Sequence, residues 1–325
     1  MHGSPKPCGV AASPYTHSGV LEPYSKHRRY NTPICSSLAM DEETLDVARA
    51  IGNCATSIAV EVPVDGPEQG TALLRAANPC NRRLCPFCEW RRSRAWRRRF
   101  FEGLPQFHQD FPTHRAIFLT LTVRNCPVNE LRTTIQEMHR GWKRMTKRNF
   151  FPSKFWFRRT EVSSRALAKP LLGALNMHPH IHCLVLVPAS YFSHGYIKQL
   201  EWQKQWMDAM RLDYVPVVDV RSARTKSSSG GATIEQSRAA ALEASKYATK
   251  ATDLINMGSF LGTYHYQVKG LRLSASSSSL KPYIADTPIT NSQLVDDELV
   301  DESETVKGKA LWFDDIQEYL FSDIL

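Results

Sequence analysis

The chain has 325 residues, of which 42% are hydrophobic and 22% are charged, an ordinary composition for a globular protein. No stretch approaches the roughly 18 consecutive apolar residues of a membrane span, and no apolar signal core follows the first residues. We therefore expect a cytoplasmic protein with no membrane partner. The net charge is +9, but residues 296–325 contain ten acids and two lysines. That segment carries −8 and the rest of the chain +17, so a polyanion such as nucleic acid is the expected partner.

An arm and a small module are predicted for the first 104 residues. Residues 1–40 are rich in Pro, Ser and Gly and lack hydrophobic periodicity, so we expect a mobile N-terminal arm. A short amphipathic helix is predicted from Asp41, and SIAVEV after it alternates as a strand does. Another helix is predicted from Pro86 to about Phe101. We predict that residues 41–104 form one module.

Strand and helix patterns succeed one another through residues 105–285, which we predict to be the second domain. Strands are predicted at 115–123, 154–162, 180–187 and 215–222, and helices at 128–147, 197–211 and 234–255. This order suits an antiparallel sheet flanked by helices, a ferredoxin-like α+β fold. The acid-rich residues 286–325 are predicted to form a C-terminal tail outside it.

Four of the eight cysteines are spaced as in a metal site. Cys85 and Cys88 enclose Pro and Phe in a tight CPFC step, and Cys80 and Cys54 precede it. Since Zn²⁺ takes four thiolates in a tetrahedron, we predict a structural zinc site formed by Cys54, Cys80, Cys85 and Cys88. Four thiolates leave no position for water, so this site is not catalytic. The alternative is a scatter of buried cysteines.

The predicted helix after the CPFC step is rich in arginine. Two tryptophans, Trp90 and Trp96, lie among the arginines. Arginines and aromatic rings together favour contact with phosphates and stacking on nucleic acid. The alternative is an ordinary solvated charged face. The candidate DNA-binding side chains are Arg91, Arg92, Arg94, Arg97, Arg98 and Arg99.

A histidine pair opens the strand predicted at 180–187. Alternate side chains of a strand share a face, so His180 and His182 lie about 6.5–7 Å apart along one face and can bind one metal ion. Glu161, on the preceding strand, is the best candidate for an oxygen ligand. His178 shares the face, but Pro179 makes its geometry doubtful. The alternatives are histidines without a metal and a solvated glutamate.

Three polar residues follow one another on the helix predicted at 234–255. Glu243, Tyr247 and Lys250 occupy positions i, i+4 and i+7, which share one helix face. A tyrosine hydroxyl has a pKa of about 10, so making it a nucleophile at pH 7 costs about 4 kcal/mol unless the phenolate is stabilised. The lysine one turn away could supply that stabilisation. By itself the pattern is equally typical of an ordinary helix surface.

Together and in this order, these residues resemble the plasmid rolling-circle replication initiators of the HUH endonuclease superfamily. FLTLTVRN (118–125) resembles the first motif of that family, and His180-Ile181-His182 resembles its metal-binding motif. EASKYATK (243–250) resembles the third motif, in the branch with a single tyrosine and a glutamate one turn earlier. CNRRLCPFCEWRR (80–92) is similar to the zinc-finger-like segment of the same branch.

The resemblance implies the HUH endonuclease fold and a nicking reaction. Mg²⁺ or Mn²⁺, held by His180, His182 and Glu161, would polarise a DNA phosphate that Tyr247 attacks. The products would be a 5′-phosphotyrosine and a free 3′-OH. Lys250 takes the place of the family's motif lysine, and Glu243 could act as the base that later activates water.

The implied partners are a plasmid double-strand origin with a single-stranded or cruciform nick site, a host helicase and a DNA polymerase. A transposase or relaxase with the same chemistry is a close alternative. A non-catalytic zinc-dependent DNA-binding regulator, or a metallohydrolase of small substrates, is a more distant one.

Overall fold

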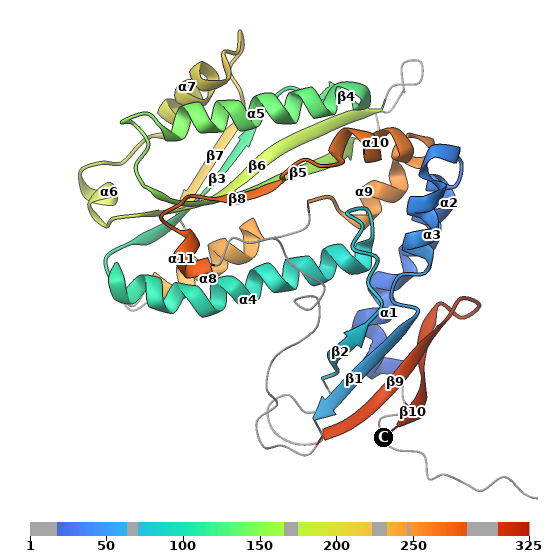
Figure 1. The fold of residues 1–325 in the computed structure, drawn as a ribbon. Helices are drawn as coiled ribbons and strands as arrows, with labels where there is room; N and C mark the ends of the chain where they lie inside the picture. Colours follow the sequence, from blue (N-terminus) through green and yellow to red (C-terminus); the bar gives the residue numbers. More distant parts are fainter. Residues whose placement is uncertain are drawn as a thin grey trace, which may run out of the picture.

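The computed structural model describes residues 18–63, 71–165, 175–222, 233–245, 248–284 and 305–324. Two antiparallel sheets organise them (Figure 1). The larger sheet has the order β7-β3-β6-β5-β8, and the short strand β4 also pairs with β6. Its strands are β3 (Arg115–Thr122), β4 (Cys126–Pro127), β5 (Phe155–Arg165), β6 (Asn176–Val187), β7 (Val218–Ser222) and β8 (Ser274–Ser276).

Helices cover both faces of this larger sheet (Figure 1). On one face, α5 (Leu131–Thr146) and α7 (Gln199–Met210) pack against strand residues such as Ile181 and Cys183. The opposite face packs against α4 (Pro86–Asp110), α8 (Thr233–Ala244) and α11 (Lys281–Ile284). The predicted α+β fold, an antiparallel sheet flanked by helices, is confirmed.

A smaller sheet of four strands joins distant parts of the sequence. Its order is β10-β9-β1-β2. The strands are β1 (Ser57–Pro63), β2 (Leu73–Ala77), β9 (Thr305–Phe313) and β10 (Glu318–Ile324). The segment predicted as an acidic tail therefore contains two strands, and that prediction is wrong for residues 305–324. Apolar residues at alternate positions, among them Ala310, Trp312 and Tyr319, place these strands in the core.

Helices also occupy the described part of the predicted N-terminal arm. The helices α1 (Glu22–Arg29) and α2 (Asn31–Leu38) bury Tyr24, Ile34 and Leu38. Residues 18–38 are therefore packed rather than mobile. The predicted boundary after residue 104 is also wrong, because it falls inside α4, which extends from the cysteine cluster to beneath the larger sheet (Figure 1).

Short helices make up the remaining described elements. They are η1 (Ser18–Leu21), η2 (Glu42–Thr44), α3 (Leu45–Gly52), η3 (Val128–Glu130), α6 (Ser190–Ser193), α9 (Ala251–Asn256), η4 (Gly258–Phe260) and α10 (Leu261–Val268).

The single helix predicted for 234–255 is interrupted. The helix α8 ends at Ala244, and α9 begins at Ala251. Two of the described residues between them form hydrogen bonds to other elements through their backbone carbonyls. The carbonyl of Ser245 accepts a hydrogen bond from Ser93 (2.8 Å), and that of Ala248 accepts one from the Val162 N–H (2.9 Å). Such bonds to α4 and β5 replace helical ones, so the described residues Ser245 and Ala248–Lys250 are not helical.

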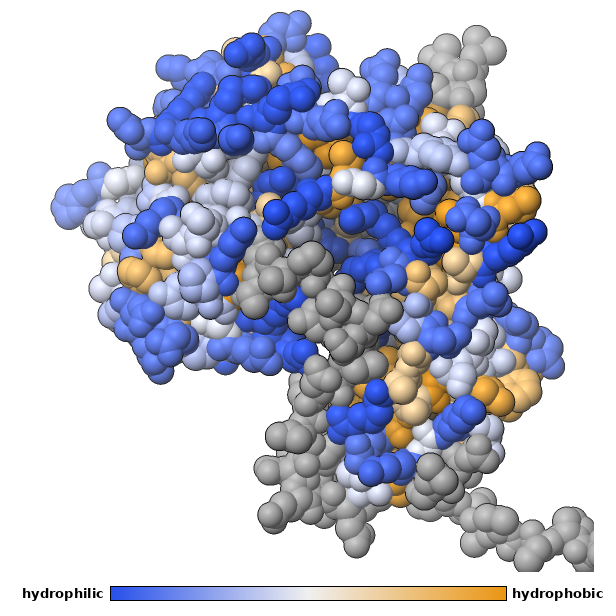
Figure 2. Space-filling view, viewed as in Figure 1, coloured by the Kyte–Doolittle hydropathy of each residue, from blue (hydrophilic) through white to orange (hydrophobic). Residues whose placement is uncertain are grey.

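Hydrophilic side chains dominate the face shown in Figure 2, most densely over α5 and α7. Within the described ranges, no helix is both long and apolar enough to cross a membrane.

Candidate metal centres

Three side chains converge where β5 and β6 run side by side. Glu161 of β5 lies directly opposite His180 of β6, and His182 is two residues further along the same face. One Glu161 oxygen, Oε2, lies 3.2 Å from Nε2 of His182 and 3.6 Å from Nε2 of His180. The predicted association of these three residues is therefore present in the structure.

The spacing of these three groups fits a divalent metal ion. Ligand atoms about 2.1 Å from an ion lie about 3.0 Å apart when they are neighbours in an octahedron. The nitrogen–oxygen distances of 3.2 and 3.6 Å are close to that separation. All three ligand atoms lie within 4.8 Å of one another. Three ligands from two adjacent strands leave further positions for water or a phosphate oxygen.

Neighbouring groups fix the orientation of the two imidazoles. Nδ1 of His182 is 3.1 Å from Oγ1 of Thr120, and the ring stacks on Phe118 at 5.3 Å between centroids. Nδ1 of His180 is 3.2 Å from the carbonyl oxygen of His178. With Nδ1 engaged in each ring, Nε2 faces the carboxylate. Partners of this kind orient metal-binding histidines and set their tautomer.

The third histidine of the strand lies outside the candidate metal-binding group formed by Glu161, His180 and His182, called the metal group below. Nδ1 of His178 is 2.8 Å from Oδ1 of Asn125, and the side chain is not among the three that approach one another. In the structure His178 contributes its carbonyl, rather than its ring, to the site.

The charge of Glu161 is stabilised although the side chain is buried. Burial alone would raise the pKa of this carboxyl. Hydrogen bonds and favourable electrostatic interactions with the His180 and His182 side chains outweigh burial and hold the pKa well below its ordinary value. The group is therefore a carboxylate at neutral pH, as a metal ligand must be.

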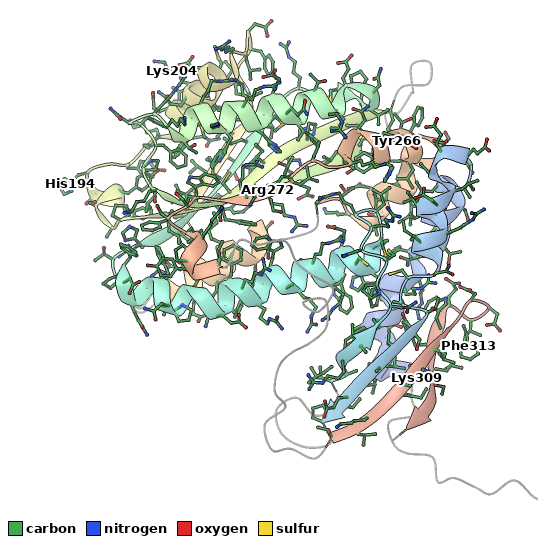
Figure 3. All side chains as sticks on the ribbon, viewed as in Figure 1. His194, Lys204, Tyr266, Arg272, Lys309 and Phe313 are labelled. Carbon is green, nitrogen blue, oxygen red and sulfur yellow. The ribbon has the colours of Figure 1, made fainter. Side chains whose placement is uncertain are left out.

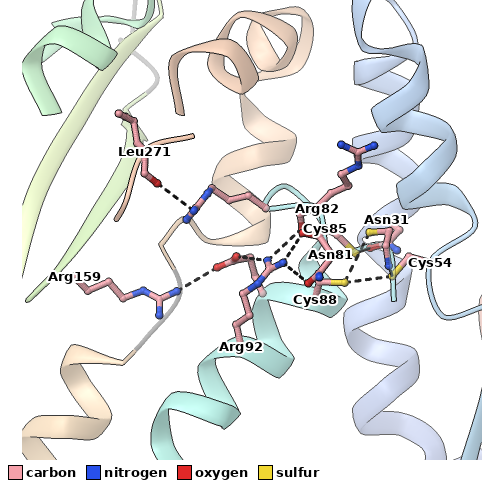
Figure 4. Close-up of polar contacts among 12 residues, drawn as sticks. Asn31, Cys54, Asn81, Arg82, Cys85, Cys88, Arg92, Arg159 and Leu271 are labelled. Atoms are coloured by element: carbon pink, nitrogen blue, oxygen red, sulfur yellow. Dashed lines mark hydrogen bonds and ion pairs between the residues drawn. The ribbon is translucent and has the colours of Figure 1, made fainter. Parts of the chain in front are cut away.

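The four predicted zinc cysteines also come together. Sγ of Cys88 lies 3.5 Å from that of Cys54 and 3.8 Å from that of Cys80, and Cys85 completes the group within 4.8 Å. In a tetrahedron with Zn–S bonds of about 2.3 Å, the sulfurs are about 3.8 Å apart. The four thiols therefore fit a tetrahedral metal ion. Figure 4 shows Cys54, from the turn after α3, beside Cys85 and Cys88 at the start of α4.

The six candidate arginines divide into different environments. Arg91 and Arg99 are buried, whereas Arg94 and Arg97 are exposed. Arg92 donates to the Glu89 carboxylate at 2.7 Å and to the Asn81 side-chain oxygen at 2.9 Å (Figure 4). Its guanidinium thus ties the helix to the cysteine loop. The arginine helix is partly structural. The exposed Arg94 and Arg97, and the half-buried Arg98, remain candidates for phosphate contact.

The two tryptophans of that helix are not available for stacking on bases. Trp90 and Trp96 are 9% and 6% exposed. Trp96 packs against Phe157 of β5, and Arg99 lies over its ring at 5.0 Å. The hypothesis that these tryptophans stack on nucleic acid is wrong, because both rings belong to the core.

The third predicted motif is only partly described. Tyr247 lies outside the described residues. Glu243 is exposed in the last turn of α8, and Lys250 is exposed at the N-cap of α9. Since α8 ends at Ala244, the three residues do not share one continuous helix face, and that part of the prediction is wrong. The residue after the tyrosine, Ala248, is hydrogen-bonded to Val162, the neighbour of Glu161.

Two further polar residues lie near the histidine pair and differ in how far the sequence pattern indicates them. Thr120 could have been found, because the alternation of FLTLTV puts it on the face opposite the buried leucines. Asp253 in α9 could not. Burial raises the pKa of its carboxyl, and the charges of Lys250, Glu161 and His180 also act on it. Nothing in an isolated helical aspartate indicates that its helix lies near the histidine strand.

Comparison with known proteins identifies the family to which the chain belongs. A family model described as "Replication protein" matches residues 71–319. "Protein rep" of Bacillus sp. is 35% identical over 209 residues, which cover 58% of this chain and 62% of that protein. "Protein rep" of Streptococcus pneumoniae is 35% identical over 172 residues, covering 48% and 49%. "Protein rep" of Bacillus amyloliquefaciens is 33% identical over 224 residues, covering 64% and 61%.

The matched region includes both metal groups except for Cys54, which precedes it. These alignments span about half to three-fifths of the length of the curated relatives. No solved structure matches the chain. Since the family model covers most of the sequence, the chain belongs to the replication-protein family, that of the plasmid rolling-circle replication initiators.

Proposed function

We propose that this protein initiates plasmid rolling-circle replication by nicking one strand of origin DNA through Tyr247. One observation carries the proposal. Glu161, His180 and His182 form a metal-binding group on the sheet of a replication protein, and the residue that follows Tyr247 is hydrogen-bonded to the strand of Glu161. The basic body of the chain supports a polyanionic substrate.

The two metal groups have different roles in this proposal. Glu161, His180 and His182 would hold Mg²⁺ or Mn²⁺, which neutralises charge on a scissile phosphate when bound. Cys54, Cys80, Cys85 and Cys88 would hold Zn²⁺, with no position left for a substrate.

The phenolic oxygen of Tyr247 then acts as the nucleophile. It loses its proton to solvent and forms a bond to the scissile phosphorus as the bond to the 3′-oxygen breaks, and the leaving oxygen takes up a proton from solvent as a 3′-OH. The enzyme remains joined to the 5′ phosphate, and the 3′-OH can prime a host polymerase after a host helicase opens the duplex. Lys250, exposed beside this segment, stabilises the phenolate or the phosphate charge.

Glu243 is proposed to release the protein at the end of the cycle. Its exposed position in the last turn of α8 leaves room for water. As a general base, its carboxylate would take a proton from water that attacks the phosphotyrosine. Glu243 is therefore needed after the covalent step and not before it.

The test is a single-turnover reaction of the full chain with an origin oligonucleotide and Mn²⁺, in which adduct and released product are followed separately. We expect Tyr247→Phe to form no adduct and to keep its DNA affinity, since only one hydroxyl is removed. An adduct that persists in this variant, attached to another tyrosine, would contradict the assignment.

The same time course tests Glu243. We expect Glu243→Ala to form the Tyr247 adduct at the parent rate and to release it about 10²–10⁴-fold more slowly. Product release as fast as in the parent protein would show that Glu243 is not the base. DNA binding without an adduct in any variant would point to the non-catalytic regulator instead.

A further inference from the structure

A cavity lies between the N-terminal helix and the segment that follows Tyr247. Its volume is about 290 Å³. Three elements form its wall: α1 with the residue after it, the first turn of α4, and the start of α9. The lining residues are Lys26, His27, Tyr30, Pro86, Glu89, Thr249, Lys250, Ala251, Thr252 and Leu254.

Aromatic rings form one side of this cavity. The His27 ring stacks on Trp90 with 4.4 Å between centroids and 19° between planes. Burial, with a smaller effect from Lys26, lowers the pKa of His27 to about 4. The ring is therefore neutral at physiological pH and offers a flat aromatic surface. Tyr30, half-buried, is the second ring. A planar ligand could continue the stack that Trp90 and His27 begin.

Positive charge surrounds the cavity, and its one acid is already neutralised. Lys26 and Lys250 are both exposed, and no ion pair within the described ranges uses either ammonium group. The Glu89 carboxylate, by contrast, is buried between Arg92 at 2.7 Å and Arg159 at 3.2 Å. Two lysines are left to attract an anion, and the one acid among the described lining residues is paired.

The same contacts connect the cavity to the metal group. Arg159, the partner of Glu89, is two residues before Glu161 on β5, and residues two apart share a strand face. The other wall, Thr249–Leu254, follows Ala248, which is hydrogen-bonded beside Glu161. Cavity and metal group therefore lie along the same part of the sheet.

We propose that this cavity binds one unpaired nucleotide of the DNA strand, next to the phosphate that Tyr247 attacks. The base stacks against His27 and Tyr30, and Lys26 and Lys250 contact the flanking phosphates. This inference rests on the proposed nicking function, since a strand cut at Tyr247 must pass the start of α9. A volume of about 290 Å³ is just below the range of about 300–1,000 Å³ for sites of drug-sized ligands, which suits one nucleotide.

The wall contributed by α1 has a further implication. Residues 26–30 precede the region matched by the family model, which begins at residue 71. The nucleotide site therefore combines the matched nicking domain with an N-terminal helix outside the match. We infer that α1 gives the protein part of its preference for the base at this position.

Photocrosslinking of the full chain tests the site without cleavage. The probe is a short oligothymidylate in which one base is 5-iodouracil, in buffer without added Mg²⁺ or Mn²⁺. A base stacked in the cavity should cross-link to His27 or Tyr30, as located by mass spectrometry. Cross-links found only elsewhere in the chain would overturn the proposal.

Two variants probe the cavity in different ways. Tyr30→Ala removes a ring, and Ala251→Trp fills the space without removing any contact of α1. We expect each to weaken oligothymidylate binding about 5- to 100-fold, the cost of losing one base–aromatic stack, and to suppress the cross-link. If Ala251→Trp binds and cross-links as the parent does, the cavity is not the site, whatever Tyr30→Ala does to folding.

Lys26 has a matched control in Lys204, an exposed lysine of α7 that lies on the opposite side of the larger sheet (Figure 3). The logarithm of affinity falls with that of salt by about 0.7 per phosphate contact on a single strand. Lys26→Ala should therefore reduce this slope by about 0.7, and Lys204→Ala should leave it unchanged. Equal slopes for the two variants would contradict a phosphate contact at Lys26.

Further outcomes distinguish a DNA strand from a free nucleotide as the ligand. They also distinguish failure of the cavity site from failure of the proposed nicking function. Free thymidine monophosphate should compete only weakly with the oligothymidylate, and competition at equal nucleotide concentration would mean a free-nucleotide site instead. A Tyr247 adduct without a cross-link in the cavity would refute this inference and leave nicking intact. A cross-link without any adduct would support the cavity as a strand site and refute nicking.

Discussion

At the scale of single residues, the metal group depends on strand alternation and pairing. His180 and His182 face the same way because one residue separates them, and Glu161 meets them because β5 pairs with β6 in the register that sets it opposite His180. The first relation could be predicted from the sequence. The second needed the register, which a hydrophobic pattern alone does not specify residue by residue.

Removal of either predicted ligand imidazole should slow adduct formation strongly. We expect His180→Ala and His182→Ala to lower the rate of Tyr247 adduct formation by about 10²-fold or more, since a metal ion contributes several kcal/mol of charge stabilisation. The rate of adduct formation is measured for each variant over a series of Mn²⁺ concentrations. His178→Ala is the control, because its ring is bonded to Asn125 instead. Equal losses in all three variants would contradict the assigned ligands.

A buried histidine should make the protein sensitive to acid. Burial, aided by the charge of Arg158, lowers the pKa of His139 to about 3, and its Nε2 lies 2.8 Å from Oγ1 of Thr160. The folded state thus resists protonation that the unfolded chain accepts near pH 6.5. The neutral His139 therefore makes its full contribution to the free energy of unfolding above pH 6.5. That contribution decreases as the pH falls toward 3.

We therefore expect the free energy of unfolding to fall by a few kcal/mol across that pH range. The variant His139→Gln, which can keep the bond to Thr160, should reduce the slope. Urea unfolding at a series of pH values measures it. An unchanged slope in the variant would assign the acid sensitivity to other groups, such as His27.

At the scale of elements, α4 links the two metal groups. It begins at the cysteine cluster, and its Glu89 pairs with Arg159 in β5 at 3.2 Å (Figure 4). Its middle and end pack beneath the larger sheet, where the Cα of Gly103 lies so close to the Tyr283 carbonyl that a Cβ would be 1.8 Å from the oxygen. The sequence predicted the helix and its arginines. It could not show that Arg91, Arg92 and Arg99 serve packing or internal contacts, because their partners are distant in sequence.

Loss of the cysteine cluster should disorder the beginning of this helix. We expect about one Zn²⁺ per chain, lost in Cys88→Ser together with protease resistance of residues 54–100, because structural zinc supplies folding free energy. Elemental analysis and limited proteolysis measure both. Cys35→Ser is the matched control, since that thiol is not one of the four clustered cysteines and donates to the Ala48 carbonyl, which a hydroxyl can also do. Native protein without zinc would refute the site.

The interruption between α8 and α9 shows where local propensity fails. The segment 234–255 is rich in alanine and has a helical pattern throughout, so one helix was predicted. Tertiary hydrogen bonds to Ser93 and Val162 take up the carbonyls of Ser245 and Ala248. A sequence pattern contains no information on such partners, because Ser93 and Val162 are distant from this segment in the sequence.

At the scale of the whole molecule, the smaller sheet joins strands from the first 80 residues to strands from the last 21 residues. β9 lies between β1 and β10, and Lys309 and Phe313 mark its course in Figure 3. Trp312 and Tyr319 pack ring to ring, and the Tyr319 hydroxyl donates to the Ala55 carbonyl beside the cysteine loop. Acidic composition suggested a tail, because charges on the exposed faces concealed the alternation of the strands.

Truncation after residue 304 should therefore destabilise the protein. Removing β9 and β10 deletes two buried aromatic rings, each contributing about 3–5 kcal/mol, so we expect the melting temperature to fall by roughly 10 °C or more. Differential scanning fluorimetry measures it. Asp315→Asn, which removes one exposed charge of the turn and no buried group, should have almost no effect. A truncated chain that melts like the parent would restore the interpretation as a tail.

The pairing of β1 with β9 also determines when the protein can finish folding. Residue 63 pairs with residue 305, so during translation β1 is complete long before its partner exists. Contacts this distant in sequence form slowly, and an edge strand without its partner can pair with other chains. Incomplete chains that already contain the tyrosine segment would expose this edge and be open to aggregation and proteolysis. The order of synthesis thus delays completion of the smaller sheet until the strand at 305–313 has been translated.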